Sequence, residues 1–348
     1  MSMLTTLCNT LLVLALHFLA CESTATSSTP PASINNNNNS NNTIQTLPKR
    51  QIGMYLLLSD DTVPNYTSTD VWSPSLYPYQ QSGVNVVYLT FINPTYMSVP
   101  PAFATLSNKL RRNTKRDNTI RPTILFALGG YSYSNHPNPW PWLTSQVSAE
   151  NMAKVVSQWP DLFGCDGVDL DIETGAGSSV VAAENLIHFV KKLNILQPKM
   201  LVTQPVFGYP QVKAESSMVN SAFNRNVTAS DRPALDAVGI MVYSGTNSLQ
   251  YLKNYVNGSQ QWEGFPIHVD VPASKVVCGM GGNAAPADLN KFVANALSGH
   301  SKGVMVWYGS VLDDSTNQTA IQYAGGGPDA SNKKTRSMWE AALKKLKN

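Results

Sequence analysis

Charge, cysteine and histidine are scarce in this chain. Only 14% of its 348 residues are charged, and 25 Lys and Arg against 22 Asp and Glu give a net charge of +3. That balance lacks the dense positive surface that phosphate backbones require, so we expect no nucleic-acid partner. Four cysteines are too few for a disulfide framework that could stabilise a chain of this length, so a hydrophobic core has to stabilise the fold.

Several catalytic and cofactor motifs are missing. The five histidines are scattered without the spacing of zinc ligands, and neither a G-x-S-x-G nucleophile elbow nor a Walker loop occurs. The glycine-rich run at 279–284 follows an expected strand as a dinucleotide-binding turn would, but the acidic residue expected about 20 positions later is absent. We therefore expect neither a metal nor a cofactor, and we interpret these glycines as a tight turn.

No apolar run is long enough to span a membrane, so we expect no membrane partner. Residues 11–20, LLVLALHFLA, have the length of the apolar core of a secretory signal peptide, and Ala20 and Ala25 behind them are candidate cleavage positions. The alternative is a buried strand or helix, but polar low-complexity sequence follows at once. We predict a signal peptide over residues 1–25 and a secreted, extracellular protein.

Residues 26–50 contain Ser, Thr, Pro and Asn with almost nothing apolar to bury, which is typical of a linker or pro-segment. They end in Lys49-Arg50, a dibasic pair of the kind that secretory processing proteases cut and that also occurs as an ordinary solvated pair. N-glycosylation sequons suit a secreted chain, and six are present, at Asn38, Asn41, Asn65, Asn226, Asn257 and Asn317.

From residue 51 to 348, short β-branched and aromatic runs alternate with stretches of helical period. This alternation predicts an α/β fold with a parallel sheet, and eight repeats match a (β/α)8 TIM barrel forming a single catalytic domain. An open doubly wound sheet is the alternative architecture. Strands are predicted at 52–58, 84–91, 123–130, 167–173, 200–206, 237–243, 275–281 and 303–309, and helices at 149–158, 179–195, 287–298 and 334–347.

Four carboxylates fall within residues 166–173, DGVDLDIE, in an otherwise apolar strand. Since side chains alternate along a strand, Asp169, Asp171 and Glu173 share one face, which in a barrel is the interior. Glu173 would stand at the C-terminal rim, where barrel enzymes place their active sites. Like charges this close share protons, so a protonated Glu173 can act as a general acid near neutral pH. The alternatives are a divalent-metal site and scattered acids on a solvated edge strand.

The segment DGVDLDIE at 166–173 resembles the D-x-x-D-x-D-x-E signature of glycoside hydrolase family 18, the chitinases and their relatives. Three weaker motifs extend the resemblance along the barrel. Residues 128–130 resemble part of the family's S-x-G-G strand, residues 241–243 its M-x-Y-D strand, and residues 303–307 its last strand, which ends in Trp. The resemblance implies a chitinase that cleaves β-1,4-linked N-acetylglucosamine polymers.

The resemblance also implies a retaining, substrate-assisted mechanism, in which the substrate's own 2-acetamido carbonyl attacks the anomeric carbon. In that mechanism Glu173 would protonate the leaving oxygen, and Asp171 would orient the acetamido N–H. Asp169 together with Asp166 would support Asp171 from below. Tyr243, which would bond the acetamido carbonyl, completes the expected catalytic set.

The resemblance further implies that Trp307 forms the floor beneath the sugar at the cleavage site. In the proline-rich loop after the third strand, Trp140 and Trp142 are candidates for stacking on sugars, with packing inside the loop as the alternative. The other predicted substrate contacts are Asp166, Tyr131, Met241, Gln204 and Ser244.

Two positions depart from the family pattern. Ala127 stands where the family has Ser, which removes a hydroxyl that would bond the lower aspartates. Ser244 stands where the family has Asp after the tyrosine, which removes a carboxylate from the substrate-facing rim.

The connection from Gly281 to Gly303 is too short for the insertion domain that deep-grooved family members carry, so we expect an open cleft and endo-acting cleavage. We also expect a monomer. Two other functions stay open. One is an endo-β-N-acetylglucosaminidase that acts on N-glycans. The other is a non-catalytic chitin-binding lectin, although such lectins commonly lose the acid that Glu173 retains here.

Overall fold

Most of the chain between residues 46 and 310 is described by the computed structural model, and it belongs to the compact unit Thr43–Asn348. The predicted signal peptide, most of the predicted linker and the predicted helix at 334–347 lie outside the described residues, as do Tyr243 and Ser244. The described ranges are 46–57, 84–108, 121–133, 139–173, 179–208, 213–224, 226–241, 248–257, 269–281 and 291–310 without 292 and 295.

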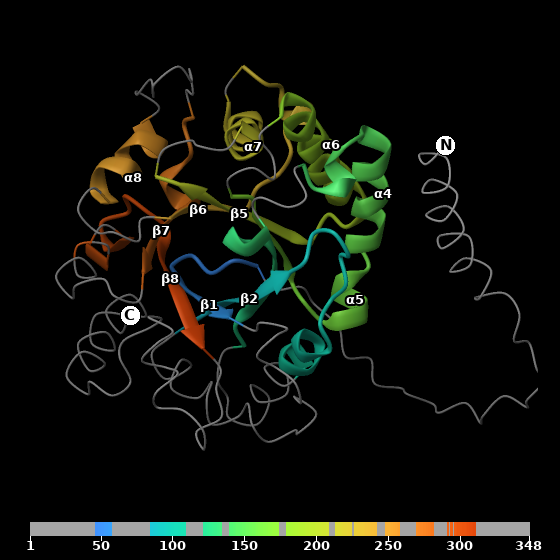
Figure 1. Ribbon diagram of the computed structural model, residues 1–348. Coiled ribbons are helices and arrows are strands. Elements are labelled where there is room, and N and C mark those ends of the chain that lie inside the picture. Colours follow the sequence, from blue (N-terminus) through green and yellow to red (C-terminus); the bar gives the residue numbers. More distant parts are fainter. Residues whose placement is uncertain are drawn as a thin grey trace, which may run out of the picture. The chain divides into compact units, whose positions relative to one another are not determined.

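Eight parallel strands form a closed barrel in chain order, and the last strand pairs with the first (Figure 1). Every predicted strand overlaps an observed one, and the closure excludes the open doubly wound sheet. The (β/α)8 barrel predicted from the alternation is therefore confirmed. The strands are β1 (Gln51–Leu57), β2 (Val86–Ile92), β3 (Thr123–Gly129), β4 (Gly167–Asp171), β5 (Leu201–Phe207), β6 (Ala237–Met241), β7 (Val276–Gly281) and β8 (Gly303–Ser310).

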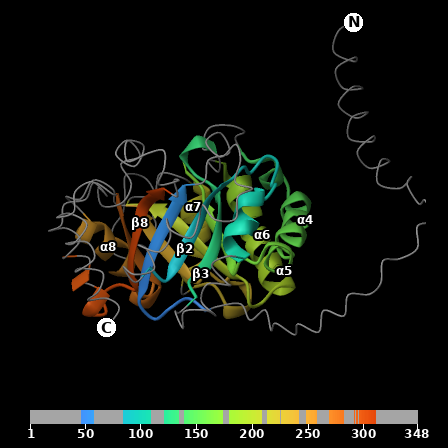
Figure 2. The same ribbon diagram turned by 90° about the horizontal axis from the view of Figure 1, so that it is seen from below.

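Helices cover the outside of the barrel, and α4, α5 and α6 lie together against one side of it (Figure 2). The labelled helices are α4 (Gln146–Val156), α5 (Trp159–Phe163), α6 (Val180–Leu196), α7 (Lys213–Phe223) and α8 (Ser248–Asn257). Short 3-10 turns are η1 (Tyr131–Tyr133), η2 (Pro141–Leu143), η3 (Ala229–Asp231) and η4 (Ala273–Lys275). Further helical turns occupy residues 101–108 and the described positions between 291 and 297.

Serine caps decide where two of the predicted helices begin. Helix α4 begins before the predicted residue 149 because the hydroxyl of Ser145 accepts the backbone N–H of Ser148 at 3.1 Å. Helix α6 begins at Val180 because Ser179 accepts the N–H of Ala182 at 3.0 Å in the same way. In both helices the cap satisfies a backbone donor that the first turn leaves without an intrahelical partner.

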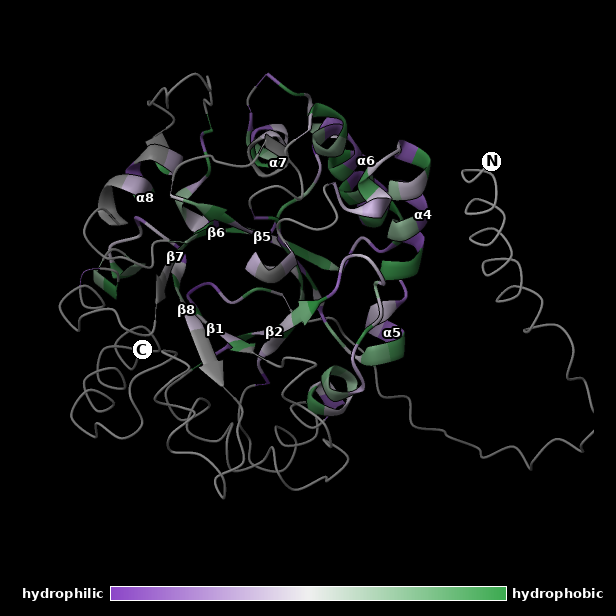
Figure 3. Cartoon of the chain, viewed as in Figure 1, coloured by the Kyte–Doolittle hydropathy of each residue, from purple (hydrophilic) through white to green (hydrophobic). Residues whose placement is uncertain are grey.

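Alternation of side chains divides the core into two layers. Val168 and Leu170 of β4, with Ile172 just after the strand, belong to the outer cluster, which lies between the strands and the helices. Figure 3 shows the corresponding pattern of hydropathy, with strands such as β2 and β6 largely hydrophobic and helices α4 and α6 striped. The inner cluster fills the barrel and includes Tyr55, Tyr88, Leu125, Met241 and Met305.

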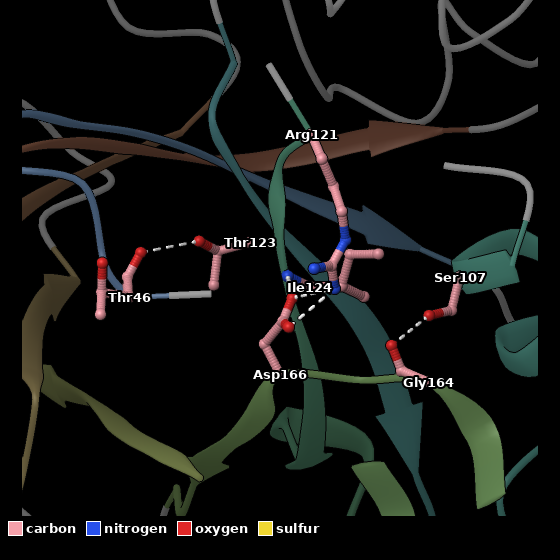
Figure 4. A network of polar contacts seen from close by, with 7 residues as sticks. All are labelled: Thr46, Ser107, Arg121, Thr123, Ile124, Gly164 and Asp166. Atoms are coloured by element: carbon pink, nitrogen blue, oxygen red, sulfur yellow. Dashed lines mark hydrogen bonds and ion pairs between the residues drawn. The ribbon is translucent and has the colours of Figure 1, made fainter. Parts of the chain in front are cut away.

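Polar contacts tie the N-terminal ends of the strands together (Figure 4). Arg121 donates to both carboxylate oxygens of Asp166 at 2.7 Å, and Asp166 also accepts the N–H of Ile124 at 2.9 Å. These bonds join the start of β3 to the start of β4. The hydroxyl of Thr123 donates to the carbonyl of Thr46 at 3.3 Å, which attaches the preceding segment to the same end of the barrel.

Residues 46–50, the end of the predicted linker, pack against the N-terminal end of the barrel. Leu47 contacts the inner cluster. The side chain of Asn85 donates to the carbonyl of Arg50 at 2.8 Å and accepts the N–H of Ile52 at 2.7 Å. The dibasic pair therefore adjoins hydrogen-bonded backbone at the point where β1 begins.

Candidate active site

Strand β4 carries the acidic side chains into the barrel. Asp169 and Asp171 are buried, with 1% and 4% of their surface exposed, and Glu173 follows two residues after the strand ends and is half-buried. The intervening Val168 and Leu170 face the opposite way, into the outer cluster. The predicted alternation along this strand is therefore confirmed for the two aspartates, and it leads up to Glu173 at the C-terminal end of the barrel.

Two hydroxyl groups hold Asp169 from different strands. Tyr55 of β1 donates to Oδ2 at 2.9 Å, and Thr203 of β5 donates to Oδ1 at 2.5 Å. Burial raises the pKa of the Asp169 carboxyl to about 7, although both hydrogen bonds favour the ionised form and act against that rise. Asp169 thus changes its charge near neutral pH in a place that water does not reach.

A second tyrosine lies beside this pair. The ring of Tyr88 stacks on that of Tyr55 with the centroids 4.2 Å apart and the planes at 6°. The side-chain nitrogen of Gln51 donates to the Tyr88 hydroxyl at 2.5 Å. Burial and the charge of Asp169 raise the pKa of Tyr88 well above its ordinary value, so Tyr88 stays neutral under Asp169.

Glu173 has the properties of a general acid. Burial raises its pKa to about 7, and the backbone N–H of Tyr131 donates a hydrogen bond that partly opposes the rise. A carboxyl group with this pKa is protonated in a large fraction of molecules at neutral pH and can still release the proton. The arrangement can therefore deliver a proton to a group bound at the C-terminal end of the barrel.

A glycine pair brings β3 close enough to make that contact. Gly129 and Gly130 have φ values of +97° and +80°, a region that side chains disfavour. A Cβ on Gly129 would lie 2.2 Å from the carbonyl oxygen of Asp171, and one on Gly130 would lie 2.5 Å from the ring of Phe91. The N–H of Gly130 instead donates to the Asp171 carbonyl at 2.8 Å, which places Tyr131 beside Glu173.

Aromatic side chains line the barrel next to the acids. The ring of Trp307 on β8 lies 5.8 Å from that of Tyr55 and 5.4 Å from that of Phe91. Met241 belongs to the inner cluster and the partly buried Trp307 packs against it, so the structure brings these two predicted substrate contacts to the interior. Tyr131 is 71% exposed at the end of β3. Each of these three positions suits a contact with a ligand in the barrel mouth.

Two predicted substrate contacts lie elsewhere. Asp166 precedes β4 at the N-terminal end of the barrel and is held by Arg121, so it anchors β3 to β4 and lies away from Glu173. Gln204 is fully buried on the face of β5 that carries Val202 and Val206 into the outer cluster, opposite to Thr203. Neither side chain is placed to touch a substrate, so the expected substrate contacts of Asp166 and Gln204 are wrong.

The two tryptophans of the proline-rich loop are core residues. Trp140 and Trp142 are 0% and 3% exposed, and their rings pack 5.6 Å apart. Trp142 also packs on Phe189 of α6 at 4.8 Å. Stacking on a sugar would require them to leave the core, so the expectation that they bind sugars is wrong and the packed alternative holds.

The sequence prediction missed Tyr55, Tyr88 and Thr203, which surround Asp169. All three sit on interior positions of predicted strands. A hydroxyl group at such a position was the available signal. It could not be assigned to Asp169 because Tyr55 and Asp169 are 114 residues apart in the sequence.

Among the described residues, no group of three or more His, Cys, Asp or Glu side chains is arranged to hold a metal ion. No helix in the described part of the chain is both long and apolar enough to cross a membrane.

Comparison by sequence finds no match, either to a protein-family model or to a curated protein. Comparison by structure finds chitinases. A chitinase from Rhizomucor miehei is 16% identical, with a TM-score of 0.52 over 79% of this chain and 100% of that chain. A glycoside hydrolase family 18 chitinase from Pseudoalteromonas aurantia is 15% identical, with a TM-score of 0.53 over 78% and 98%. The catalytic domain of a chitinase from Pyrococcus furiosus is 14% identical, with a TM-score of 0.51 over 76% and 86%. The chain thus has a fold like that of the family 18 chitinases.

Proposed function

We propose that this chain is a glycoside hydrolase that cleaves β-1,4-linked N-acetylglucosamine polymers. A shared fold alone does not decide activity, so the proposal depends on the site. The observation that carries it is the order of acidic groups along β4 and just beyond it. Glu173, with a pKa raised to about 7, follows the buried Asp169 and Asp171 at the C-terminal end of the strand. Their spacing matches the D-x-x-D-x-D-x-E signature of glycoside hydrolase family 18 that residues 166–173 resemble, and the fold is similar to that of a family 18 chitinase.

The proposed reaction is retaining and assisted by the substrate. Glu173 gives its proton to the glycosidic oxygen while the carbonyl oxygen of the substrate's 2-acetamido group attacks the anomeric carbon. The bond to the leaving sugar breaks and an oxazolinium-like intermediate forms, with Asp171 accepting a hydrogen bond from the acetamido N–H. Water then attacks the anomeric carbon, and the Glu173 carboxylate takes its proton, which restores the starting state.

We further propose that the protein is secreted, acts as a monomer and cleaves within chains. The connection between Gly281 and Gly303 is too short for an insertion domain that would deepen the groove. The exposed side chain of Asn226, in one of the sequons, is accessible for glycosylation in a secreted protein. A product profile dominated from the start by disaccharide released from chain ends would contradict the endo-acting part of the proposal.

The decisive experiment measures hydrolysis of N-acetylglucosamine tetramer to hexamer by the wild-type chain and by Glu173→Gln, with products and anomers followed by chromatography. Glu184→Gln is the matched control, because Glu184 is exposed on helix α6. Cleavage that yields the β-anomer, lost in Glu173→Gln and kept in Glu184→Gln, is the expected result.

Two other outcomes would refute chitin hydrolysis and would each identify another function. Binding of the oligomers without cleavage, by both the wild type and Glu173→Gln, would indicate a lectin. Neither binding nor cleavage, with release of intact oligosaccharide from a glycoprotein, would indicate an N-glycan endoglycosidase.

A further inference from the structure

Asp169 lies between one strand that offers a hydroxyl group and one that does not. The barrel register pairs it with Ala127 across β3 and β4, and with Thr203 across β4 and β5. Ala127 is fully buried and has no polar atom in its side chain. The Thr203 hydroxyl lies 2.5 Å from Oδ1 of Asp169. The resembled family motif has its serine at the position of Ala127, so in this chain the hydroxyl comes from the opposite side.

We propose that Thr203 is a positioning residue that holds the Asp169 carboxylate from β5 in place of the hydroxyl that β3 lacks. This inference rests on the proposed function, in which Asp169 supports Asp171. Thr203 is itself buried, so it acts through Asp169 and does not touch the substrate.

Two donors at different oxygens determine the orientation of this carboxylate. Tyr55 binds Oδ2 from β1, and Thr203 binds Oδ1 from β5. With only one donor, the carboxylate could rotate and a buried oxygen would lose its partner, which is costly inside a protein. The two hydroxyl groups therefore act together, and neither replaces the other because each binds a different oxygen of the carboxylate.

The hydrogen bond also affects the pH at which Asp169 ionises. The titratable groups around Asp169 are Tyr55 on β1, Tyr88 on β2 and Asp171 on its own strand, and Ala127 on β3 adds none. A donated hydrogen bond favours the carboxylate, so its removal raises the pKa of Asp169. If activity needs Asp169 ionised, the acidic limb of the pH profile then moves to higher pH. If activity needs Asp169 protonated, the alkaline limb moves to higher pH.

The test compares Thr203→Val, which keeps the shape and removes the hydroxyl, with Thr203→Ser, which keeps the hydroxyl. For Thr203→Val we expect kcat on chito-oligomers to fall roughly tenfold, KM to stay unchanged and the pH profile to shift upward. Thr203→Ser should remain close to the wild type. If Thr203→Val does not fold, Thr203→Ala carries the same expectation, with folding checked by circular dichroism.

A second-site variant separates positioning from packing. Adding Ala127→Ser to Thr203→Val returns a hydroxyl from β3, and we expect it to recover most of kcat and to restore the pH profile. A wild-type profile in Thr203→Val would overturn the proposal. An equal loss of kcat in Thr203→Val, Thr203→Ser and the double variant, with no shift of the pH profile, would also overturn the proposal. The loss would then come from altered packing and not from the missing hydroxyl group.

A readout that does not depend on activity separates this proposal from the proposed function. The Asp169 carboxyl can be followed by NMR in protein labelled with ¹³C-Asp and assigned with Asp169→Asn. An upward shift of its titration in Thr203→Val supports the proposal even if neither the wild type nor Glu173→Gln cleaves chito-oligomers. An unchanged titration refutes it whatever the activity.

Discussion

The backbone N–H of Tyr131 donates a hydrogen bond to the carboxylate of Glu173, so the residue that follows the glycine pair of β3 holds the acid that follows β4. The bond exists because Gly130 turns the chain and its N–H meets the carbonyl of Asp171 at 2.8 Å. Two neighbouring strand ends are thereby fixed to each other at the point where we propose that the reaction occurs.

The pH dependence of hydrolysis follows from Glu173. Its pKa is about 7 and the proposed step needs the protonated form, so kcat/KM should fall as the pH rises above about 7. Natural oligomers should show this fall strongly. A 4-nitrophenyl glycoside should show it weakly, because its leaving group needs little protonation. Steady-state kinetics between pH 5 and 9 on both substrates tests this, and equal alkaline limbs would argue against Glu173 as the acid.

The stability of the fold should depend on pH through Asp169. Its pKa is raised from 3.8 to about 7 by folding, so between these values the folded state holds a proton that the unfolded chain has lost. The free energy of unfolding therefore decreases as the pH rises from about 4 to about 7, by an amount on the order of a few kcal/mol.

The variant Asp169→Asn removes this titration and should abolish activity. The difference in the free energy of unfolding, variant minus wild type, should be more positive at pH 8 than at pH 4.5. Urea unfolding at both pH values measures it. Asp161→Asn, at an exposed position on α5, is the control and should show no such difference. If Asp169→Asn changes the stability equally at both pH values, the assignment of this titration to Asp169 is contradicted.

Substitution of Gly129 should be far more damaging than substitution of Gly299. Both have positive φ, at +97° and +79°, so Ala costs about 1–2 kcal/mol in backbone strain at each. At Gly299 nothing lies within 4 Å of the added Cβ, whereas at Gly129 it would meet the Asp171 carbonyl at 2.2 Å. We expect Gly129→Ala to lose several kcal/mol and most activity, and Gly299→Ala to keep its activity. Similar thermal unfolding of the two variants would show that the close approach does not matter.

The segment 46–50 should stabilise the barrel. A chain that begins at Gln51 loses the contacts of Leu47, Thr46 and Arg50, and the buried amide that donates to the Lys302 carbonyl at 3.0 Å becomes a charged amino group. Chemical denaturation should show it less stable, by on the order of 2 kcal/mol or more, than a chain that begins at Thr43. Equal midpoints for the two chains would show that cleavage after Arg50 leaves the fold intact.

The number of strands and the placement of the acids could be predicted from the sequence. A strand has a period of two residues, so Asp169 and Asp171 had to share a face, with Val168 and Leu170 on the other. Eight alternations of strand and helix predict parallel strands joined by crossover helices, and their number matches that of a (β/α)8 barrel. The glycine pair and Trp307 were likewise visible as local patterns.

Only the tertiary structure decided what surrounds those acids. The partners of Asp169 come from β1 and β5, and the register of a closed barrel, which no local pattern encodes, brings them together. Trp142 packs on Phe189 of α6 and Trp140 packs on Trp142, contacts that loop composition cannot reveal. Local periodicity thus determined which way each side chain points, and barrel closure determined which side chain it meets.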